Sequence, residues 1–312
     1  MSLLVVGTVA FDSIETPYGQ AEQVVGGAAT YISLAASYFT SHIQLVSVIG
    51  DDFPEATLAD LTKRGVDLQG LQVKKGEKSF YWSGKYHSDM NSRDTLVTDL
   101  NVLADFDPVL PESYRNAEYV MLGNLTPAVQ RRVLDQLTSR PDLIAMDTMN
   151  FWMDHALGEL LEVIKRVDLL TINDEEARQL TGEYSLVKAA GHILNMGPHI
   201  LVIKKGEHGA LLFLKDRDDQ EIHIFYAPAM PLMDVFDPTG AGDTFAGGMV
   251  GYLAQTRDLS FANLKRALIY GSAMASFCVE KFSIDRLTEL DVPQILQRIE
   301  KFRALVHFDR EE

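Results

Sequence analysis

Cysteine is almost missing from this chain: its 312 residues include one, Cys278, which excludes an internal disulfide framework. The apolar neighbours of this cysteine, at 275–279, indicate a buried structural thiol. Also missing are an apolar run of the roughly 18–20 residues that span a membrane and the basic stretch that opens a signal peptide. These absences predict a protein of the reducing cytoplasm with no membrane partner.

Positive charge is also in short supply. The sequence has 28 Lys and Arg against 44 Asp and Glu, which gives a formal net charge of −16. Because surfaces that bind nucleic acid or anionic lipid are basic, this balance predicts neither as a partner. An acidic protein can still bind a nucleotide through backbone N–H groups, a helix dipole, Mg²⁺ and a few placed cations.

Short apolar runs rich in β-forming residues alternate with longer helical patterns along the chain. The runs predict buried strands at 3–9, 44–49, 119–122, 143–146, 169–172 and 201–203. The patterns between them predict helices at 28–39, 54–65, from Thr126-Pro127 onward, and at 154–165, 185–196, 261–279 and 293–306. This alternation predicts one α/β domain over residues 1–312, with a doubly wound, mostly parallel sheet flanked by helices.

Two segments break the alternation. Residues 14–25 and 70–103 have no long helical pattern, and within the second segment 79–86 and 94–98 are typical of exposed strands. Strands inserted into a parallel α/β core predict a small β-sheet lid over one edge of the sheet. Arg93 is the natural cation of such a lid, and the lid is also the expected contact of a homodimer.

The most informative stretch is Asp237-Pro238-Thr239-Gly240-Ala241-Gly242-Asp243-Thr244-Phe245. Its glycines allow a tight turn that points consecutive N–H groups one way, just before an apolar helix. The N-terminus of such a helix attracts anions. Asp243 in the first turn is either a simple capping group or a general base. An anion site with a base at its edge is what phosphoryl transfer to an alcohol needs.

This stretch resembles the C-terminal signature of the ribokinase-like (PfkB) carbohydrate kinases, Asp-x-Thr-Gly-Ala-Gly-Asp-x-Phe, at every defining position. The resemblance implies a ribokinase-like fold and transfer of the γ-phosphoryl group of ATP to a hydroxymethyl group of a sugar. It implies that Asp243 is the general base and that Gly240, Ala241 and Gly242 form the anion hole. It further implies that Thr239 lies at the nucleotide and that Asp237 helps to hold a monovalent cation, K⁺.

Two other stretches resemble the family's nucleotide site. Asn173 and Glu176 match its Asn-x-x-Glu motif, which implies that they order the water shell of Mg²⁺ from one helix face. The alternative is an acidic first turn that only complements the helix dipole. Gly206 and Gly209 match the nucleotide loop Thr-x-Gly-x-x-Gly, and Lys204 replaces the threonine. A lysine there can reach the phosphates of the nucleotide, whereas a tight hairpin by itself explains the glycines.

The expected acceptor site is drawn from the first half of the chain. Asp12, at the end of the first strand, and Gly26-Gly27 resemble the family's substrate signature, which implies that Asp12 binds sugar hydroxyls and that the glycines admit the substrate. Tyr31 replaces a common asparagine, and its ring either stacks on a base or sugar or packs in the core. Asn150 falls in the stretch 147–150, where many members have Asp-Pro-Asn-x-Arg, and is expected to line the pocket.

Other function classes fit the sequence less well. It has no Gly-x-x-x-x-Gly-Lys-Ser/Thr loop and no Gly-x-Gly-x-x-Gly after its first strand, which excludes P-loop and Rossmann dehydrogenase interpretations. A non-catalytic binding homologue is the alternative of another class, and the intact Asp243, Asn173 and Glu176 count against it. Within the kinases, a nucleoside acceptor is the alternative to a free sugar, slightly favoured by Tyr31.

Overall fold

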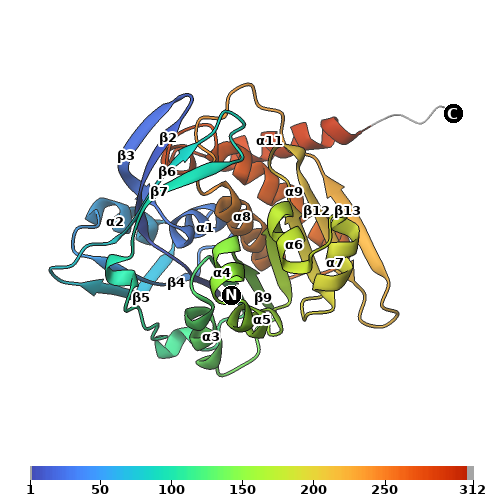
Figure 1. Cartoon of the computed structure of the whole chain (residues 1–312), viewed down its shortest axis with the longest axis horizontal. Coiled ribbons are helices and arrows are strands. Elements are labelled where there is room, and N and C mark those ends of the chain that lie inside the picture. Colours follow the sequence, from blue (N-terminus) through green and yellow to red (C-terminus); the bar gives the residue numbers. More distant parts are fainter. Residues whose placement is uncertain (1, 308–312) are drawn as a thin grey trace.

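A nine-stranded sheet forms the centre of the computed structural model, which describes residues 2–307 (Figure 1). Its strands are β1 (Leu3–Val6), β4 (Ile43–Gly50), β5 (Val66–Lys74), β8 (Tyr119–Leu122), β9 (Leu143–Asp147), β10 (Leu169–Asn173), β11 (Ile200–Lys204), β12 (Ala210–Lys215) and β13 (Ile222–Ala227). They lie in the order β13-β12-β11-β10-β9-β8-β1-β4-β5. Neighbours from β11 to β5 pair in parallel, and β12 and β13 form an antiparallel edge. The predicted doubly wound, mostly parallel α/β sheet is thus confirmed.

Helices cover both faces of this sheet because its strands carry apolar side chains on both sides. In β1, Leu3 and Val5 belong to the core on one face, and Leu4 and Val6 to the core on the other. The first core is closed by α1 (Ala28–Ala36), α2 (Glu55–Lys63), α8 (Ala241–Thr256) and α9 (Phe261–Cys278). The second is closed by α3 (Pro127–Asp135), α5 (Leu157–Ile164), α6 (Asp174–Thr181) and α7 (Leu186–Leu194).

The helix predictions hold with one correction. Thr126 caps α3 as expected, with its Oγ1 accepting the Val129 N–H at 3.3 Å and Pro127 as the first helical residue. The single helix predicted at 154–165 is wrong: the chain forms α4 (Asn150–His155) and then α5, because Ala156, at φ −145°, leaves the helical conformation. The remaining helices are α10 (Asp285–Thr288) and α11 (Val292–Val306). None of the helices in residues 2–307 is both long and apolar enough to cross a membrane.

A second sheet of four strands, here called the lid sheet, lies beside the main one (Figure 1). It comprises β2 (Ala10–Thr16), β3 (Gly19–Gly26), β6 (Phe80–Tyr86) and β7 (Arg93–Asp99), in the order β3-β2-β6-β7. The strands predicted at 79–86 and 94–98 are confirmed, and every residue of β7 is exposed.

The boundaries of the lid sheet differ from the predicted ones. The strand expected at 3–9 ends at Val6, and the chain enters the lid sheet at Ala10 rather than at residue 14. At the other insertion, residues 70–74 belong to β5 of the main sheet, where Gly70 pairs with Val46 of β4. A methyl group on Gly70 would lie 2.5 Å from the Leu45 carbonyl oxygen, so glycine is needed for this close pairing.

Candidate active site

Three neighbouring parallel strands end in polar residues. Asp147 ends β9, Asn173 ends β10 and Lys204 ends β11, and the register pairs Asn173 with Lys204. Because side chains alternate along a strand, Asp147 and Lys204 project to the face of Ala145 and Val202, on which α8 packs. The polar groups meet at the C-terminal edge of the sheet, where open α/β sheets bind their ligands.

The signature stretch forms the loop and first turn of α8 at this edge. Gly240 adopts a left-handed φ of 72°, and its carbonyl accepts the Thr244 N–H at 2.8 Å to start the helix. Ala241 donates its N–H to a proline carbonyl of the same loop at 3.2 Å, so this predicted part of the anion hole is engaged. The N–H groups of Gly242 and Asp243 have no hydrogen-bond partner within residues 2–307. They are the free donors of the helix start and can hold an anion.

Lys204 points at this helix start. Its Nζ lies 2.6 Å from Oδ2 of Asp147, and a methyl group on Gly242 would lie 3.2 Å from the same Nζ. Burial by itself would lower the pKa of Lys204, but Asp147 and Glu176 together raise it above its usual value. The side chain is therefore a charged ammonium group beside the free N–H groups of α8.

Asp243 has the environment of a general base. Burial raises the pKa of its carboxyl to about 7, and Asp147 adds to the rise, while Lys204 and Arg93 oppose it. A base whose pKa is close to the working pH accepts a proton and gives it up again readily. The side chain is only partly exposed and lies in the first turn of α8, beside the free N–H groups that can hold an anion.

Asp12 reaches the same region from the lid sheet. It lies inside β2, not at the end of the first strand as predicted, because that strand ends before it. Burial raises the pKa of Asp12 to about 7, with Asp237 and Asp243 adding to the rise and the Gly27 N–H lowering it. Gly26 faces this carboxylate so closely that a methyl group would overlap it. Glycine is needed at position 26 because the Asp12 side chain approaches the backbone there.

Tyr31 packs in the core. Its side chain is 1 % exposed, and its ring occupies the space that a methyl group on Gly240 would need. Among the described residues its hydroxyl has no hydrogen-bond partner. Of the two interpretations of this aromatic ring, the structure supports packing, because a buried ring offers no face to a base or sugar.

Asn173 and Glu176 bond to one another as a capping box. The Asn173 Oδ1 accepts the Glu176 N–H at 2.8 Å, and the Glu176 Oε2 accepts the Asn173 N–H at 2.7 Å. We predicted that Asn173 and Glu176 share one helix face, but Asn173 is instead the N-cap of α6. Burial raises the pKa of Glu176 to about 7, although Lys204 lowers it. No group of three or more His, Cys, Asp or Glu in residues 2–307 is arranged to hold a metal ion.

The predicted nucleotide loop is a tight connection between β11 and β12. Gly206 and Gly209 have positive φ values of 54° and 87°, so the hairpin interpretation of these glycines is confirmed. Asn91, at the turn between β6 and β7, fills the space beside Gly206 that a methyl group would take. The turn between β6 and β7 of the lid sheet therefore contacts the loop between β11 and β12. Nothing in the sequence predicted this contact.

The lid sheet also contacts the signature loop. The Tyr86 hydroxyl and Oγ1 of Thr239 lie 3.2 Å apart. Asp237 is 1 % exposed and fixes the loop through two hydrogen bonds. Its two carboxyl oxygens accept the N–H groups of Thr239 at 2.8 Å and of Ser283 at 3.0 Å. This partner of Thr239 could not be predicted from the sequence, because a tyrosine in a strand predicted to be exposed carries no signal of the residue that it contacts.

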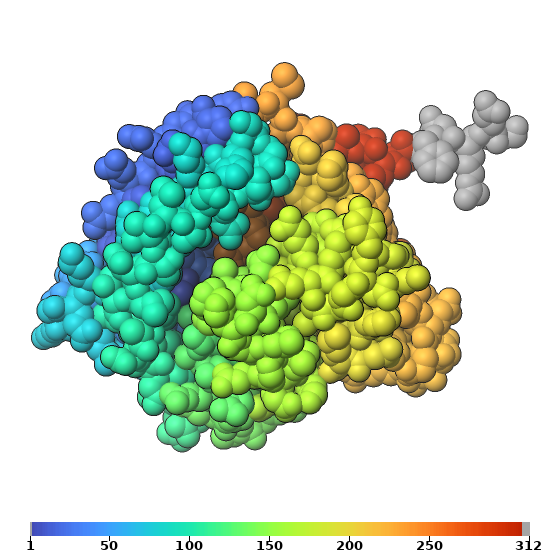
Figure 2. All heavy atoms as spheres, viewed as in Figure 1, coloured from blue at the N-terminus to red at the C-terminus, as the bar shows by residue number. Residues whose placement is uncertain are grey.

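A hollow opens between the lid sheet and the helices at the C-terminal strand ends (Figure 2). Arg93 begins β7 of the lid sheet, and its charge lowers the pKa of both Asp243 and Glu176. Asn150, the remaining predicted pocket residue, is the half-buried first residue of α4, three positions after Asp147. Most of the predicted site residues thus lie around the start of α8 and the ends of β9, β10 and β11. Within residues 2–307, the side chain of Asn150 has no hydrogen bond to any of them.

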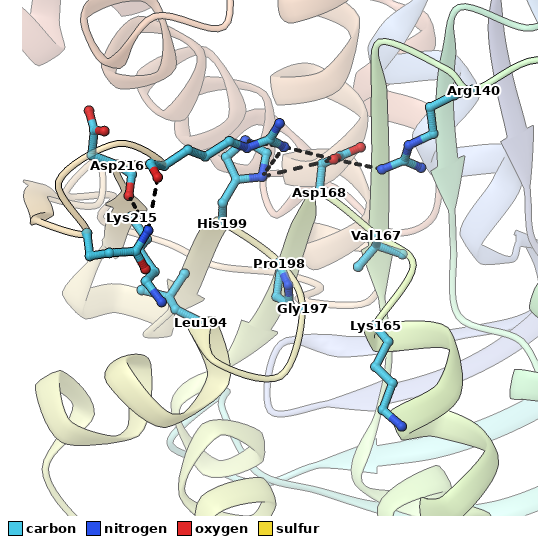
Figure 3. A pocket seen from close by; sticks show the side chains of 12 residues that line it. Arg140, Lys165, Val167, Asp168, Leu194, Gly197, Pro198, His199, Lys215 and Asp216 are labelled. Atoms are coloured by element: carbon cyan, nitrogen blue, oxygen red, sulfur yellow. Dashed lines mark hydrogen bonds and ion pairs between the residues drawn. The ribbon is translucent and has the colours of Figure 1, made fainter.

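A cavity of about 350 Å³ lies at the opposite ends of β10 and β11 (Figure 3). Asp168 stands at its centre, with Arg140 at 2.8 Å and Arg217 at 3.5 Å. The Ile144 N–H also donates to Asp168 at 2.9 Å. These charges pair with one another, so the cavity holds a structural ion-pair cluster at the edge of the sheet opposite the candidate active site.

Known proteins resemble this chain over most of its length. The profile of the pfkB family carbohydrate kinases matches residues 2–289. The chain is 29 % identical over 265 residues to a cytidine kinase of Thermococcus kodakarensis, covering 83 % of this chain and 91 % of that protein.

Two solved structures share the fold. The nucleoside kinase of Methanocaldococcus jannaschii has a TM-score of 0.75 at 21 % identity and covers 96 % of this chain and 98 % of its own. An Escherichia coli protein provisionally named ribokinase II, solved with ATP and Mg²⁺, has a TM-score of 0.77 at 17 % identity and covers 97 % and 99 %. With a ribokinase fold and a family match over nearly its whole length, this chain belongs to the PfkB family of carbohydrate kinases.

Proposed function

We propose that this kinase transfers the γ-phosphoryl group of ATP to the hydroxymethyl oxygen of a sugar ring, and that the ring is the ribose of a nucleoside. One observation carries the transfer chemistry. A carboxyl group with its pKa raised to about 7, Asp243, stands beside two free N–H donors and the ammonium group of Lys204. That arrangement supplies a base and an anion site in adjacent positions.

The residues divide the work as follows. Asp12 accepts hydrogen bonds from ring hydroxyls and holds the acceptor. Asp243 takes the proton of the attacking hydroxymethyl oxygen, and the N–H groups of Gly242 and Asp243 hold the transferring phosphoryl oxygens. The loop from Gly206 to Gly209 contacts the nucleotide, together with Thr239.

Mg²⁺ fits the acidic side of the site. One oxygen of Glu176, Oε2, accepts a hydrogen bond in the cap of α6, and Oε1 would bind a water of the metal ion. The capping bonds to Asn173 orient the Glu176 side chain. When bound, the metal neutralises phosphate charge. Glu176 acts through water because Mg²⁺ keeps several water ligands and takes few protein ones.

The acceptor is assigned from the relatives rather than from an aromatic wall. The cytidine kinase resembles this chain over 91 % of its own length, and the nucleoside kinase shares its fold. Since Tyr31 is buried, the base of a nucleoside has to be held by other groups facing the hollow under the lid sheet. A free sugar is the alternative acceptor, because Asp12 binds either kind of ring.

Product analysis over a panel of acceptors tests this function. The purified protein is incubated with MgATP and cytidine, uridine, inosine, adenosine, ribose or fructose, with Asp243→Asn as the inactive control. We expect nucleoside 5′-monophosphate and ADP in equal amounts from at least one nucleoside. Turnover of ribose or fructose with none of any nucleoside would reject the nucleoside assignment and keep the sugar kinase.

We also propose that K⁺ supports the signature loop. Both carboxyl oxygens of Asp237 already accept backbone N–H groups, so the cation would be held by the carbonyl groups of Asp237 and Thr239. Activity should rise when K⁺ replaces tetramethylammonium at constant ionic strength. Equal rates in both salts would remove this cation from the proposal.

A homodimer through the lid sheet is the last part of the proposal. β7 is an edge strand of that sheet, and Leu96, Val97 and Leu100 expose 57 %, 40 % and 50 % of their surface. Covering these side chains with a second copy removes apolar surface from water. Sedimentation should show a dimer that Leu96→Asp dissociates. A monomer at all concentrations would contradict it.

A further inference from the structure

We propose that Lys204 is a catalytic residue whose ammonium group carries positive charge to the phosphoryl group while it is transferred, and that Asp147 is its positioning residue. This inference rests on the phosphoryl transfer proposed above. It goes beyond nucleotide binding, because it assigns Lys204 to the reacting group rather than to the bound nucleotide.

The position of the ammonium group carries the proposal. Lys204 Nζ lies 3.2 Å from where a methyl group on Gly242 would be, and Gly242 supplies one of the two free N–H groups at the start of α8. An anion held by those N–H groups is therefore within reach of the ammonium group. An ammonium group has three donors, and the bond to Asp147 at 2.6 Å uses one. Two remain for phosphoryl oxygens.

The surroundings hold this charge in place. The Lys204 side chain is 16 % exposed and that of Asp147 is 7 % exposed, so the pair is poorly screened by water. Lys204 ends β11, which is fixed between β10 and β12, so its backbone has little freedom. A charge that is already oriented costs no reorganisation when negative charge develops on the transferring group.

The charges around Lys204 come from four elements. Asp147 on β9, Glu176 on α6 and Asp243 on α8 are carboxylates that raise its pKa. Arg93 on β7 is the other cation that acts on Asp243 and Glu176. Lys204 is the cation of this group that lies deepest, next to the free N–H donors.

In the transfer step, the bond between the γ-phosphorus and the bridging oxygen of ADP breaks as a bond to the acceptor oxygen forms. The proton of the acceptor goes to Asp243. Lys204 keeps its proton throughout and donates hydrogen bonds to the non-bridging oxygens.

A purely structural role makes a different prediction. If Lys204 serves only to neutralise buried Asp147, then removing both charges together should restore activity, because no unpaired buried charge remains. If Lys204 acts on the phosphoryl group, the doubly substituted protein should stay as slow as the protein without the lysine. Lys204→Met, Asp147→Asn and the double variant therefore form a decisive cycle.

The expected result is a fall in kcat of about 10²–10³ for Lys204→Met, typical of the loss of one preorganised donor to a developing anion. The double variant should show the same fall, and Asp147→Asn should stay within about tenfold of wild type, since an amide oxygen still accepts from the ammonium group. Lys205→Met is the matched control, because the Lys205 Nζ lies 5.9 Å from the centre of the Tyr226 ring instead. It should be as active as wild type.

A binding measurement gives a second readout. Titration calorimetry with MgADP and aluminium fluoride, a mimic of the transferring phosphoryl group, should show weaker binding by Lys204→Met and by the double variant. Binding of MgADP without fluoride should stay the same in all the variants. Thermal unfolding of the double variant, which has no unpaired charge at this position, shows whether the fold is intact.

Recovery of kcat in the double variant, or undiminished aluminium fluoride binding by it, would overturn the proposal and leave Lys204 as a neutralising partner of Asp147. The cycle is run with whichever acceptor the wild-type protein phosphorylates. Failure of the nucleoside assignment is seen in the wild-type panel, and failure of this inference is seen in the variants, so the two are distinguishable.

Discussion

The hydroxyl of Tyr86 on the lid sheet lies 3.2 Å from Oγ1 of Thr239 in the loop before α8. This bond ties the sheet that carries Asp12 to the loop that precedes Asp243. The proposed acceptor side and the proposed phosphoryl side of the site are thereby linked by one hydroxyl pair, in addition to the contact of Asn91 with Gly206.

Tyr86→Phe should loosen the contact between the lid sheet and the loop before α8. The lost hydrogen bond contributes about 0.5–1.5 kcal/mol, so the arrangement in which the sheet contacts this loop should become several-fold less populated. Hydrogen exchange followed by mass spectrometry should show faster exchange in β6 and β7 of the variant. In the wild-type protein the same strands should exchange more slowly once acceptor is bound. Identical exchange in both proteins, with and without acceptor, would mean a static sheet.

Asp243→Asn should remove the base while keeping its size. Loss of a general base lowers kcat by about 10²–10⁴. ATP affinity, measured by calorimetry, should be preserved because the N–H donors of α8 are unchanged. A kcat within a few-fold of wild type would refute the assignment of Asp243.

The raised carboxyl pKa values predict how stability depends on pH. Asp12, Glu176 and Asp243 have pKa values of about 7 when folded, above their values of 3.8, 4.5 and 3.8 in the absence of the fold. Between these limits the folded protein binds more protons than the unfolded one, so stability falls as pH rises through 7. The Tm of the ligand-free protein should drop from pH 5.5 to pH 8. Asp243→Asn should reduce this drop, and an equal slope in both proteins would contradict the prediction.

Glu176→Gln should shift the Mg²⁺ dependence of activity to higher concentration. Glutamine still accepts the Asn173 N–H, so the capping box and α6 are kept while the negative charge is lost. Glu175→Ser is the matched control, one position along the same helix turn. An unchanged Mg²⁺ titration with lower activity at every concentration would argue against metal organisation by Glu176.

Tyr31→Phe should leave both stability and activity intact, since the hydroxyl it removes is buried without a partner among the described residues. Tyr31→Ala should instead destabilise the protein by about 3–5 kcal/mol through the cavity it leaves under Gly240. Thermal unfolding and product assays separate the two. A selective loss of nucleoside turnover in a stable Tyr31→Ala protein would restore the stacking interpretation.

Much of the site could be predicted because its signals are contiguous in the sequence. The stretch from Asp237 to Phe245 carries the turn, the helix start and the carboxylate together, and the alternation of strands and helices indicated the sheet. The pairing of Lys204 with Asp147 could not be predicted, because the two are 57 residues apart and meet only through the register of β9, β10 and β11. The cap made by Asn173 and Glu176 was not predicted, because their spacing was interpreted either as a metal motif or as an acidic first turn that complements the helix dipole.

Because α8 follows every strand of both sheets in the sequence, the proposed base is made after all the groups that it works with. As the chain leaves the ribosome, residues up to 227 contain both sheets, the carboxylate of Asp12 and the Lys204–Asp147 pair, but not the proposed base, Asp243. One face of the main sheet also lacks two of its covering helices, α8 and α9, until then. Residues after 227 therefore complete both the hydrophobic core on this face and the proposed catalytic site, so a product truncated at residue 227 lacks both.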